Sequence, residues 1–364
     1  QEVKKVVSVP VIAANLIRSP KQAEEQLEAG IQDFVSLGRP HIADPHWVQK
    51  VQNGKEKEIK RCICCLYCFE SMMNGAYTGT HGHCSVNPFV GREKEKLKHN
   101  GNGRKVLIIG AGVAGLCAAE LLARRGFSVT VLEKEYSAGG QINLADKPPH
   151  KAKLHWCVED LETNCLSNGV DIQYGVNADQ NVIDSYSPEY IIFATGANAV
   201  HPKAFSGDHV VTVTDVLNGT VQYSGKKICV IGSGMTGLET SELLVEQGNQ
   251  VSVIEMADQI APGAWFQQLD DAMPKLVQAG TQFYTSTKLA DILPSGIAVE
   301  DTKTGKKYTI ECDGVVLSMG VRPDNTLYNE LKDRYNNVYA IGDCLKSGRI
   351  YNATEDAYHL AITL

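Results

Sequence analysis

The sequence lacks two features that would assign it to large functional classes: a run of apolar residues long enough to span a bilayer, and an excess of basic residues. A transmembrane helix needs about 20 consecutive apolar residues. The 42 Asp and Glu residues outnumber the 35 Lys and Arg residues, and the formal net charge is −7. Nucleic acids and anionic membranes bind surfaces rich in Lys and Arg. We therefore expect neither a nucleic acid nor a membrane as a partner.

The N-terminal residues also lack the apolar core of a secretory signal peptide. With 43% hydrophobic and 21% charged residues, the composition is that of an ordinary soluble α/β protein. We expect a cytoplasmic location and a small-molecule substrate as the partner. The sequence leaves open whether the protein forms a homo-oligomer.

The 11 cysteines are spread unevenly, since five of them lie between residues 62 and 84. A disulfide scaffold distributes its cysteines along a small secreted chain, so a metal centre fits this spacing better. Cys62, Cys65 and Cys68 follow one another at two-residue gaps, and Cys84 supplies a fourth thiolate. Three close thiolates and a distant one are typical of a 4Fe–4S cluster. A structural zinc ion, which more often binds two separated Cys-x2-Cys pairs, and free thiols are the alternatives.

Three other side chains of this segment are not expected to bind the metal. Cys64 is adjacent to Cys65, and neighbouring thiols do not easily point into one small cage. His81 and His83 could act as ligands, but four thiolates already complete the set.

From Lys105 onward, a pattern of strand, glycine turn and helix occurs twice, which indicates a duplicated unit. In the first copy Gly110 makes a tight turn, Gly112 lets the backbone approach a pyrophosphate, and Gly115 lets helix and strand pack closely. The anion is expected at the helix N-terminus, where free N–H groups point. Glu133 ends the next strand and can accept hydrogen bonds from ribose hydroxyls.

The second copy has the same parts at the same spacing: Gly232, Gly234, Gly237 and, at the end of the next strand, Glu255. A lone glycine pattern is weak, whereas the helix, the second strand and the terminal acid supply the confirming context. The alternative is a pair of glycine-rich turns without a ligand. A carboxylate at Glu255 repels the 2′-phosphate of NADPH, so NADH is favoured.

Three further segments distinguish the two copies. Residues 193–197 close a strand after the first copy, residues 318–323 close one after the second, and residues 339–344 come near the end. Together with the nested order, they resemble the flavoprotein disulfide-reductase superfamily with two dinucleotide domains. The resemblance implies that the first copy binds FAD and the inserted second copy binds the nicotinamide nucleotide.

On this resemblance, Asp343 contacts the ribityl chain of FAD, and Gly342, Thr195 and Gly196 also lie at the cofactor. The superfamily's redox-active cysteine pair is missing, because neither copy contains a Cys-x2-Cys or Cys-x4-Cys pair. Electrons are therefore expected to leave the flavin by another route, through the cysteine cluster.

A cysteine cluster between a strand pair and an FAD unit resembles the Old Yellow Enzyme-like NADH:flavin oxidoreductases with an iron–sulfur cluster. That family includes 2,4-dienoyl-CoA reductase, 2-enoate reductase and trimethylamine dehydrogenase. Residues 9–50 resemble the last two strands of its (β/α)8 barrel, whose loops hold the FMN phosphate. The resemblance assigns to FMN the residues Asn15, Gly38 and Arg39, and to FAD the residues Gly140 and Gln141.

The family's proton-donating Tyr and His lie on barrel strands that this sequence does not include, so no catalytic residue is named. The chain is expected to be the C-terminal portion of a longer protein. We expect an α/β fold, with the end of a (β/α)8 barrel followed by two nested Rossmann-like domains. The expected domains are the barrel end at 1–50, the cluster segment and linker at 51–100, the FAD domain at 104–222 and 315–364, and the NAD(H) domain at 223–314.

The expected function is an NADH-dependent flavin oxidoreductase. It would pass electrons from NADH to FAD, a 4Fe–4S cluster and FMN, and would reduce an activated C=C bond of an enoate, enoyl-CoA or enone. One alternative is an electron-donating module that serves a partner and has no substrate site of its own. Another is a fragment that only binds nucleotides.

Overall fold

The computed structural model describes residues 1–14 and 17–364, and these form two compact units. The first unit comprises residues 1–142, 153–196 and 324–364, and the second comprises residues 143–152 and 197–323. The chain therefore leaves the first unit and returns to it twice. Within the described ranges, no helix is both long and apolar enough to cross a membrane.

The first unit is built around a parallel sheet with the strand order β17-β6-β3-β4-β5. Its strands are β3 (Lys105–Ile109), β4 (Ser128–Glu133), β5 (Asp171–Tyr174), β6 (Tyr190–Phe193) and β17 (Val338–Ala340). Central strand β3 buries Val106 and Ile108 on one face and Leu107 and Ile109 on the other. A continuous apolar run is typical of a parallel strand that is covered on both faces.

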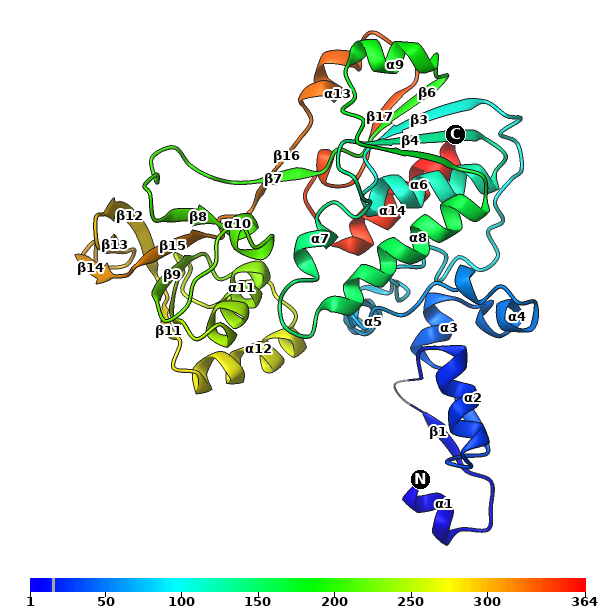
Figure 1. Ribbon diagram of the computed structural model, residues 1–364, viewed down its shortest axis with the longest axis horizontal. Coiled ribbons are helices and arrows are strands. Elements are labelled where there is room, and N and C mark those ends of the chain that lie inside the picture. The colour runs from blue at the N-terminus through cyan, green and yellow to red at the C-terminus, as the bar shows by residue number, and fades with distance from the viewer. Residues whose placement is uncertain (15–16) are drawn as a thin grey trace. The chain divides into compact units, whose positions relative to one another are not determined.

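Helices cover both faces of this sheet (Figure 1). The face of Val106 and Ile108 packs against α6 (Val113–Arg124), α8 (Trp156–Ser167) and α14 (Ile350–Thr363). The opposite face packs against α9 (Gln180–Tyr186) and α13 (Thr326–Leu331). Helix α6 is almost wholly buried, and its alanines allow α8 and α14 to lie close on either side.

The second unit repeats the plan with the strand order β11-β10-β9-β15-β8, again all parallel. Its strands are β8 (Val210–Thr212), β9 (Lys227–Ile231), β10 (Gln250–Ile254), β11 (Gln282–Tyr284) and β15 (Gly314–Leu317). An antiparallel sheet follows, made of β12 (Thr287–Leu293), β13 (Gly296–Asp301) and β14 (Lys307–Glu311). The helices are α10 (Val213–Leu217), α11 (Met235–Glu246) and α12 (Phe266–Gln278), and β7 (Ala197–Ala199) pairs with β16 (Val321–Pro323). The folded unit is thus larger than residues 223–314.

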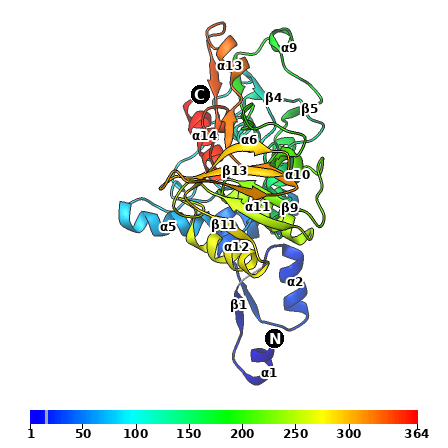
Figure 2. The same ribbon diagram turned by 90° about the vertical axis from the view of Figure 1, so that its left-hand side faces the viewer.

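The N-terminal end of the first unit contains a parallel strand pair, β1 (Ile12–Ala14) and β2 (Phe34–Ser36), joined by α2 (Pro20–Glu28) (Figure 2). Ser19 caps α2 by accepting the N–H of Gln22. The α/β class and the Rossmann-like units are confirmed, whereas the described strands of this region pair only with each other and form no closed barrel. The remaining elements are α1 (Glu2–Val6), α3 (Arg39–Ala43), α4 (Trp47–Gln52), η1 (Glu56–Glu58), α5 (Tyr67–Thr78), α7 (Ile142–Ala145), η2 (Ala152–His155) and η3 (Gly342–Cys344).

Candidate functional site

The first glycines of the two predicted nucleotide loops have the same geometry. A Cβ atom at Gly110 would lie 2.4 Å from the carbonyl oxygen of Ala194, and one at Gly232 would lie 2.2 Å from that of Ser318. Their φ angles are 109° and 104°, which side chains rarely adopt. Only glycine lets each strand turn into its helix here.

The third glycines allow close packing between the helix and the turn. A Cβ atom at Gly115 would lie 2.0 Å from the carbonyl oxygen of Gly110, and one at Gly237 would lie 2.1 Å from that of Gly232. These contacts are the close helix–strand approach that the glycine pattern predicts.

The middle glycines face open space. Gly112 and Gly234 are the N-caps of α6 and α11, and among the described residues a Cβ atom on either would meet nothing within 4 Å. In the first unit Gly139 forms a β-bridge with Gly112, and a Cβ atom at Gly140 would lie 3.5 Å from the Gly112 Cα. Gln141 follows directly. A pyrophosphate therefore has room to approach the helix N-terminus.

Glu133 holds the first glycine loop from the end of β4. Its carboxylate accepts the N–H of Ala111 at 2.7 Å and the N–H of Glu135 at 2.9 Å. The side chain is buried, with 7% of its surface exposed. The predicted ribose acceptor thus also fixes the turn that carries the glycines.

Glu255 has the same role in the second unit, with one added partner. It accepts the N–H of Ser233 at 2.9 Å, the hydroxyl of Ser233 at 2.6 Å and the N–H of Ala257 at 2.8 Å. Burial alone would raise the pKa of Glu255, but these hydrogen bonds outweigh it and hold the pKa below its usual value of 4.5. The Ser233 hydroxyl also accepts the N–H of Ala261 at 2.8 Å.

Sequence reasoning missed Ser233 as a site residue. The only signal was its place inside the glycine pattern, where the first copy has Ala111. Because the pattern accepts any residue there, the spacing alone could not identify the hydroxyl.

The turn of Gly342 and Asp343 lies against the start of α6. A Cβ atom at Gly342, whose φ is 63°, would lie 2.8 Å from the Cβ of Ala114. Asp343 accepts the N–H of Gly348 at 2.8 Å, and burial raises the pKa of its carboxyl. The turn thus comes to the same helix end as the first glycine loop.

Thr195 and Gly196 lie where the chain leaves the first unit, beside Asp324, where the chain re-enters it. The Thr195 hydroxyl donates to the carbonyl oxygen of Asp324, and Gly196 accepts the Asp324 N–H at 2.9 Å. Thr195 also hydrogen-bonds with Cys344, which directly follows Asp343. Strands β6 and β17 are parallel neighbours, so these predicted FAD residues meet at the carboxyl edge of the sheet, where α/β proteins bind ligands.

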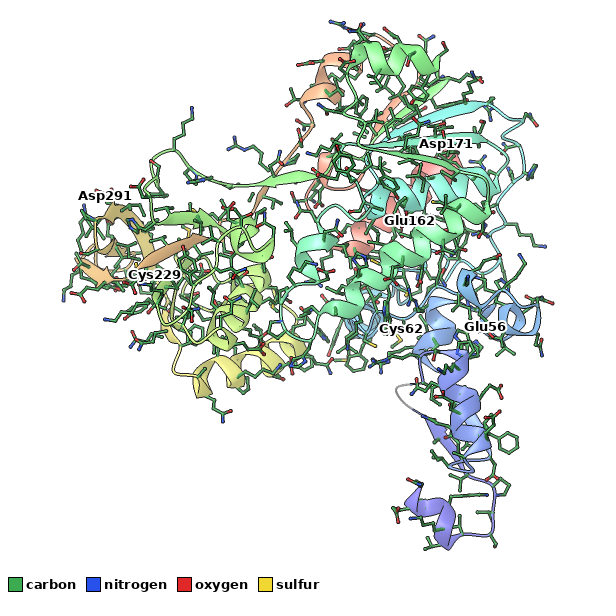
Figure 3. All side chains as sticks on the ribbon, in the orientation of Figure 1. Glu56, Cys62, Glu162, Asp171, Cys229 and Asp291 are labelled. Carbon is green, nitrogen blue, oxygen red and sulfur yellow. The ribbon has the colours of Figure 1, made fainter. Side chains whose placement is uncertain are left out.

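The four predicted metal ligands line one small cavity. Cys68 belongs to the first turn of α5, and Cys62, Cys65 and Cys84 belong to the flanking loops. Figure 3 labels Cys62, where sulfur atoms of the segment gather. Cys64 is not among the lining residues. The four cysteines that the spacing groups thus line the same cavity, and their role as metal ligands stays a prediction.

The loop that carries these cysteines passes twice through the left-handed backbone region. Cys64 has a φ of 56° and Leu66 a φ of 60°. Such angles are uncommon for residues other than glycine, and they cluster at ligand sites. Turns of this kind can direct successive N–H groups into one concave site, as around iron–sulfur centres.

Burial shapes the protonation of these thiols. It raises the pKa of Cys68 and raises that of Cys84 to about 12. The thiols of Cys62 and Cys64 hydrogen-bond to each other, which raises the pKa of Cys62 and lowers that of Cys64. A buried thiolate needs a positive partner, and iron is one that would supply it.

The arrangement of the cysteines bears on which metal centre they could bind. In the described ranges, no three His, Cys, Asp or Glu side chains are arranged around one metal position. A tetrahedral zinc ion holds its sulfur ligands at about 2.3 Å. In a 4Fe–4S cluster each thiolate binds a different iron, so the ligands enclose a larger cage.

One buried and one partly exposed ion pair fix the cysteine segment to the rest of the first unit. The Lys60 ammonium lies 2.6 Å from the carboxylate of Glu120 on α6. The backbone N–H and the Nε of Arg61 donate to Asp160 on α8 at 2.7 and 2.8 Å. These partners lie 60 and 99 residues away in the sequence, and no local pattern marks them.

The predicted FMN residues are only partly described. Gly38 is the N-cap of α3, Arg39 is its first residue, and Arg39 also lines the cysteine cavity. Asn15 lies outside the described residues. The structure thus places one predicted FMN residue beside the predicted cluster ligands, within one unit.

The comparisons define the class of protein. Residues 104–357 match the pyridine nucleotide-disulphide oxidoreductase family, so the chain belongs to that family. Residues 1–58 match the NADH:flavin oxidoreductase / NADH oxidase family. The resemblance to Old Yellow Enzyme-like flavin oxidoreductases is thereby confirmed, and the two families imply flavin and NAD(P)H as cofactors.

Individual relatives match nearly the whole chain. An NADH oxidase of Thermoanaerobacter brockii is 36% identical over 99% of this chain and 56% of its own length. A cinnamate reductase of Clostridium sporogenes is 31% identical over 98% of this chain and 54% of its own length. The structure of 2-naphthoyl-CoA reductase superposes with a TM-score of 0.92 at 27% identity, over 100% of this chain and 55% of that one. The chain therefore spans about half the length of these relatives.

Proposed function

We propose that this chain is the electron-input part of a flavoenzyme that carries electrons from NADH through FAD and a 4Fe–4S cluster to FMN. The enzyme would reduce an activated C=C bond of an enoate, enoyl-CoA or enone. When bound, FAD would let a two-electron donor exchange electrons with a one-electron carrier, which NADH and a cluster cannot do directly.

One observation carries the proposal: the four predicted cluster ligands line a single cavity in the same compact unit as the first glycine loop. Ion pairs from Lys60 and Arg61 hold the segment of this cavity against α6 and α8 of the predicted FAD fold. Electron transfer requires that the carriers keep a fixed arrangement. The two ion pairs would keep the cluster segment fixed relative to the flavin.

The residues have distinct roles in this proposal. The N–H groups at the start of α6 would hold the FAD pyrophosphate, and Glu133 would accept the ribose hydroxyls. Asp343 would contact the ribityl chain. In the second unit the start of α11 and Glu255 would bind NADH. Cys62, Cys65, Cys68 and Cys84 would hold the iron, and Gly38, Asn15 and Arg39 would hold the FMN phosphate.

The substrate class rests on relatives. Two of these relatives are named after their substrates, cinnamate and 2-naphthoyl-CoA. In each of these compounds an unsaturated carbon is conjugated to a carboxyl or thioester group. Because the chain spans about half of such relatives, the activated C=C bond is proposed for the whole enzyme and not for a pocket in this chain.

The test is to purify the chain without oxygen, count iron, zinc, FAD and FMN, and measure NADH-driven dye reduction. We expect close to four irons and one FAD per chain. Zinc in place of iron would refute the relay. FAD and iron without FMN would instead favour the electron-donating module.

A pair of cysteine variants sharpens this test. Cys84→Ala removes a residue that lines the cavity, so iron should be lost while FAD remains. Cys64→Ala changes a cysteine that lies outside the lining, and iron should remain. Equal iron content in the two variants would contradict the ligand assignment.

A further inference from the structure

One charged side chain lies in the wall of the cysteine cavity. Among the described residues, the lining consists of the four predicted ligands, Ser85, Arg39 and four apolar side chains, Ile42, Ile63, Leu66 and Val86. Arg39 is thus the only lining residue of the described ranges with a permanent charge, since a guanidinium does not lose its proton in proteins. Apolar surroundings screen a charge less than water does, so this charge acts strongly on a group in the cavity.

Helix α3 holds Arg39 at the cavity through contacts with both ends of the cysteine segment. Arg39 is the first residue of this helix. The side-chain amide of Asn87, in the loop after the fourth predicted ligand, donates to the carbonyl oxygen of Ile42 at 2.8 Å. Asp44, which directly follows α3, accepts the backbone N–H of Lys60 at 2.9 Å, just before the first predicted ligand. The backbone that carries Arg39 is therefore fixed relative to the loops of the predicted ligands.

A positive charge at this place has a defined effect on an iron–sulfur centre. Four thiolates give a 4Fe–4S cluster a net negative charge, and net charge is among the factors that set its reduction potential. Reduction adds one electron, so a nearby positive charge stabilises the reduced state more than the oxidised state. The resemblance assigns Arg39 to the FMN phosphate alone, and its place in the cavity wall indicates a second role.

We propose that Arg39 raises the reduction potential of the cluster by keeping a permanent positive charge in the wall of the cavity. This inference rests on the proposed function, since it requires iron on the four cysteines. Reduction adds one electron, no bond forms or breaks at Arg39, and its guanidinium keeps its protons in both states. Arg39 would thus favour electron transfer from the flavin to the cluster.

The test is a redox titration of the anaerobic chain, followed by electron paramagnetic resonance. FMN is first removed, because its negative phosphate would offset the charge of Arg39. Arg39→Gln removes the charge, and the one-electron equilibrium constant for reduction should fall roughly threefold to tenfold, where tenfold equals 59 mV. Arg39→Lys keeps a charge, so its potential should stay closer to that of the unchanged chain. Equal potentials in the unchanged chain and the glutamine variant would overturn the proposal, as would a lysine variant displaced as far as glutamine.

Two further variants separate the charge from other effects of the substitution. Arg39→Met has neither the charge nor a hydrogen-bond donor, and its potential should fall as far as that of Arg39→Gln. A fall in the methionine variant that the glutamine variant does not show would assign the effect to lost hydrogen bonds and overturn the proposal. Arg334 donates to Gln180 and does not line the cavity, so Arg334→Gln is the matched control and should leave the potential unchanged. An equal shift in Arg334→Gln would make the effect one of net charge alone, which also contradicts the proposal.

The iron content distinguishes failure of this inference from failure of the proposed function. If the unchanged chain contains no iron, the proposed function fails. If iron is present and the potential does not respond to the charge at Arg39, only the inference fails. Iron content should be the same in all variants, because Arg39 is not a ligand. Loss of iron from both neutral variants would make Arg39 a structural support of the segment and overturn its electrostatic role.

Discussion

The two nucleotide units share one glycine geometry but differ in what surrounds it. In each unit the first and third glycines have no room for a Cβ atom, the second faces open space, and a buried carboxylate holds the turn. In the first unit Gly140 and the turn of Gly342 and Asp343 also come to the helix start. In the second unit β15 is followed by no Gly-Asp turn. Its loop is closed by the Ser233 hydroxyl and Ala261.

The number of segments around each helix start suits a different use of the nucleotide in each unit. Several segments that meet around one helix end can enclose a cofactor that stays bound. A single glycine loop with a ribose acceptor suits a nucleotide that must enter and leave during each turnover. In the proposed function, the same helix-end chemistry would hold a resident FAD in the first unit and an exchangeable NADH in the second.

The largest effect is expected when a side chain fills the open space at the second glycine of each loop. Gly112→Val should abolish FAD binding without unfolding the unit, because a Cβ atom there meets no neighbour in the described ranges. Each N–H bond to a charged phosphate contributes about 1.5–3 kcal/mol, so loss of two should weaken binding by more than about 100-fold. The measurement is FAD per chain after gel filtration.

Gly234→Val is the matched variant in the second unit. FAD and iron should stay at full occupancy, and the KM for NADH should rise at least about tenfold. Loss of FAD from Gly234→Val, with FAD retained in Gly112→Val, would reverse the assignment of the two units.

A second prediction concerns the cysteine segment, which is fixed to the first unit. Burial would lower the pKa of Lys60, but the nearby Glu120 carboxylate outweighs it and holds the pKa above its usual value. Lys60→Met should leave the buried Glu120 carboxylate with only its longer, 3.4 Å contact to Arg124, at a cost of about 1–3 kcal/mol in unfolding free energy. Denaturant unfolding and the rate of iron loss would measure it.

The control for this prediction is an exposed pair of the same segment. Lys55 lies 3.1 Å from Glu58 at the surface, and Lys55→Met should cost less than about 1 kcal/mol. Equal costs for the two lysine variants would show that the buried pair does not anchor the segment.

The sequence predicted the features that depend on local spacing. The glycine loops, their carboxylates and the four cavity cysteines are set by fixed offsets, and each offset has a physical reason. Sequence reasoning could not find the partners of Lys60 and Arg61, because α6 and α8 reach them only through the tertiary fold. It also could not give the hydroxyl of Ser233 a role, since its partner Ala261 lies in a loop with no pattern of its own.

A third prediction uses the charge of Glu255. The pKa of this carboxyl is lower in the folded protein than its usual value of 4.5, so the folded state binds the proton less tightly. Its contribution to stability is therefore complete above pH 4.5 and is lost as the pH falls through the lower folded value. Glu255 therefore stays ionised from pH 8 to pH 5, and its titration should not change the KM for NADH in that range.

Glu255→Gln tests the same charge through cofactor choice. Removal of the charge should reduce the preference for NADH over NADPH by about tenfold, because the 2′-phosphate is no longer repelled. The ratio of kcat/KM for the two nucleotides is the measurement. Glu133→Gln is the counterpart, and it should weaken FAD without changing that ratio. A ratio that responds equally to both variants would mean that the units are not specialised as proposed.

The smallest expected effect comes from the one residue by which the two carboxylate networks differ. Ser233→Ala gives the second loop the residue that the first loop has at Ala111 and removes the 2.6 Å hydrogen bond to Glu255. Two backbone N–H groups still hold Glu255 and the hydroxyl does not itself bind the nucleotide, so the KM for NADH should rise only about two- to tenfold with kcat unchanged. The reciprocal Ala111→Ser should leave FAD content unchanged, because Glu133 already accepts two N–H groups. If Ser233→Ala leaves the KM unchanged, the backbone N–H groups alone orient Glu255, and the two loops differ in their enclosing segments but not in their carboxylate networks.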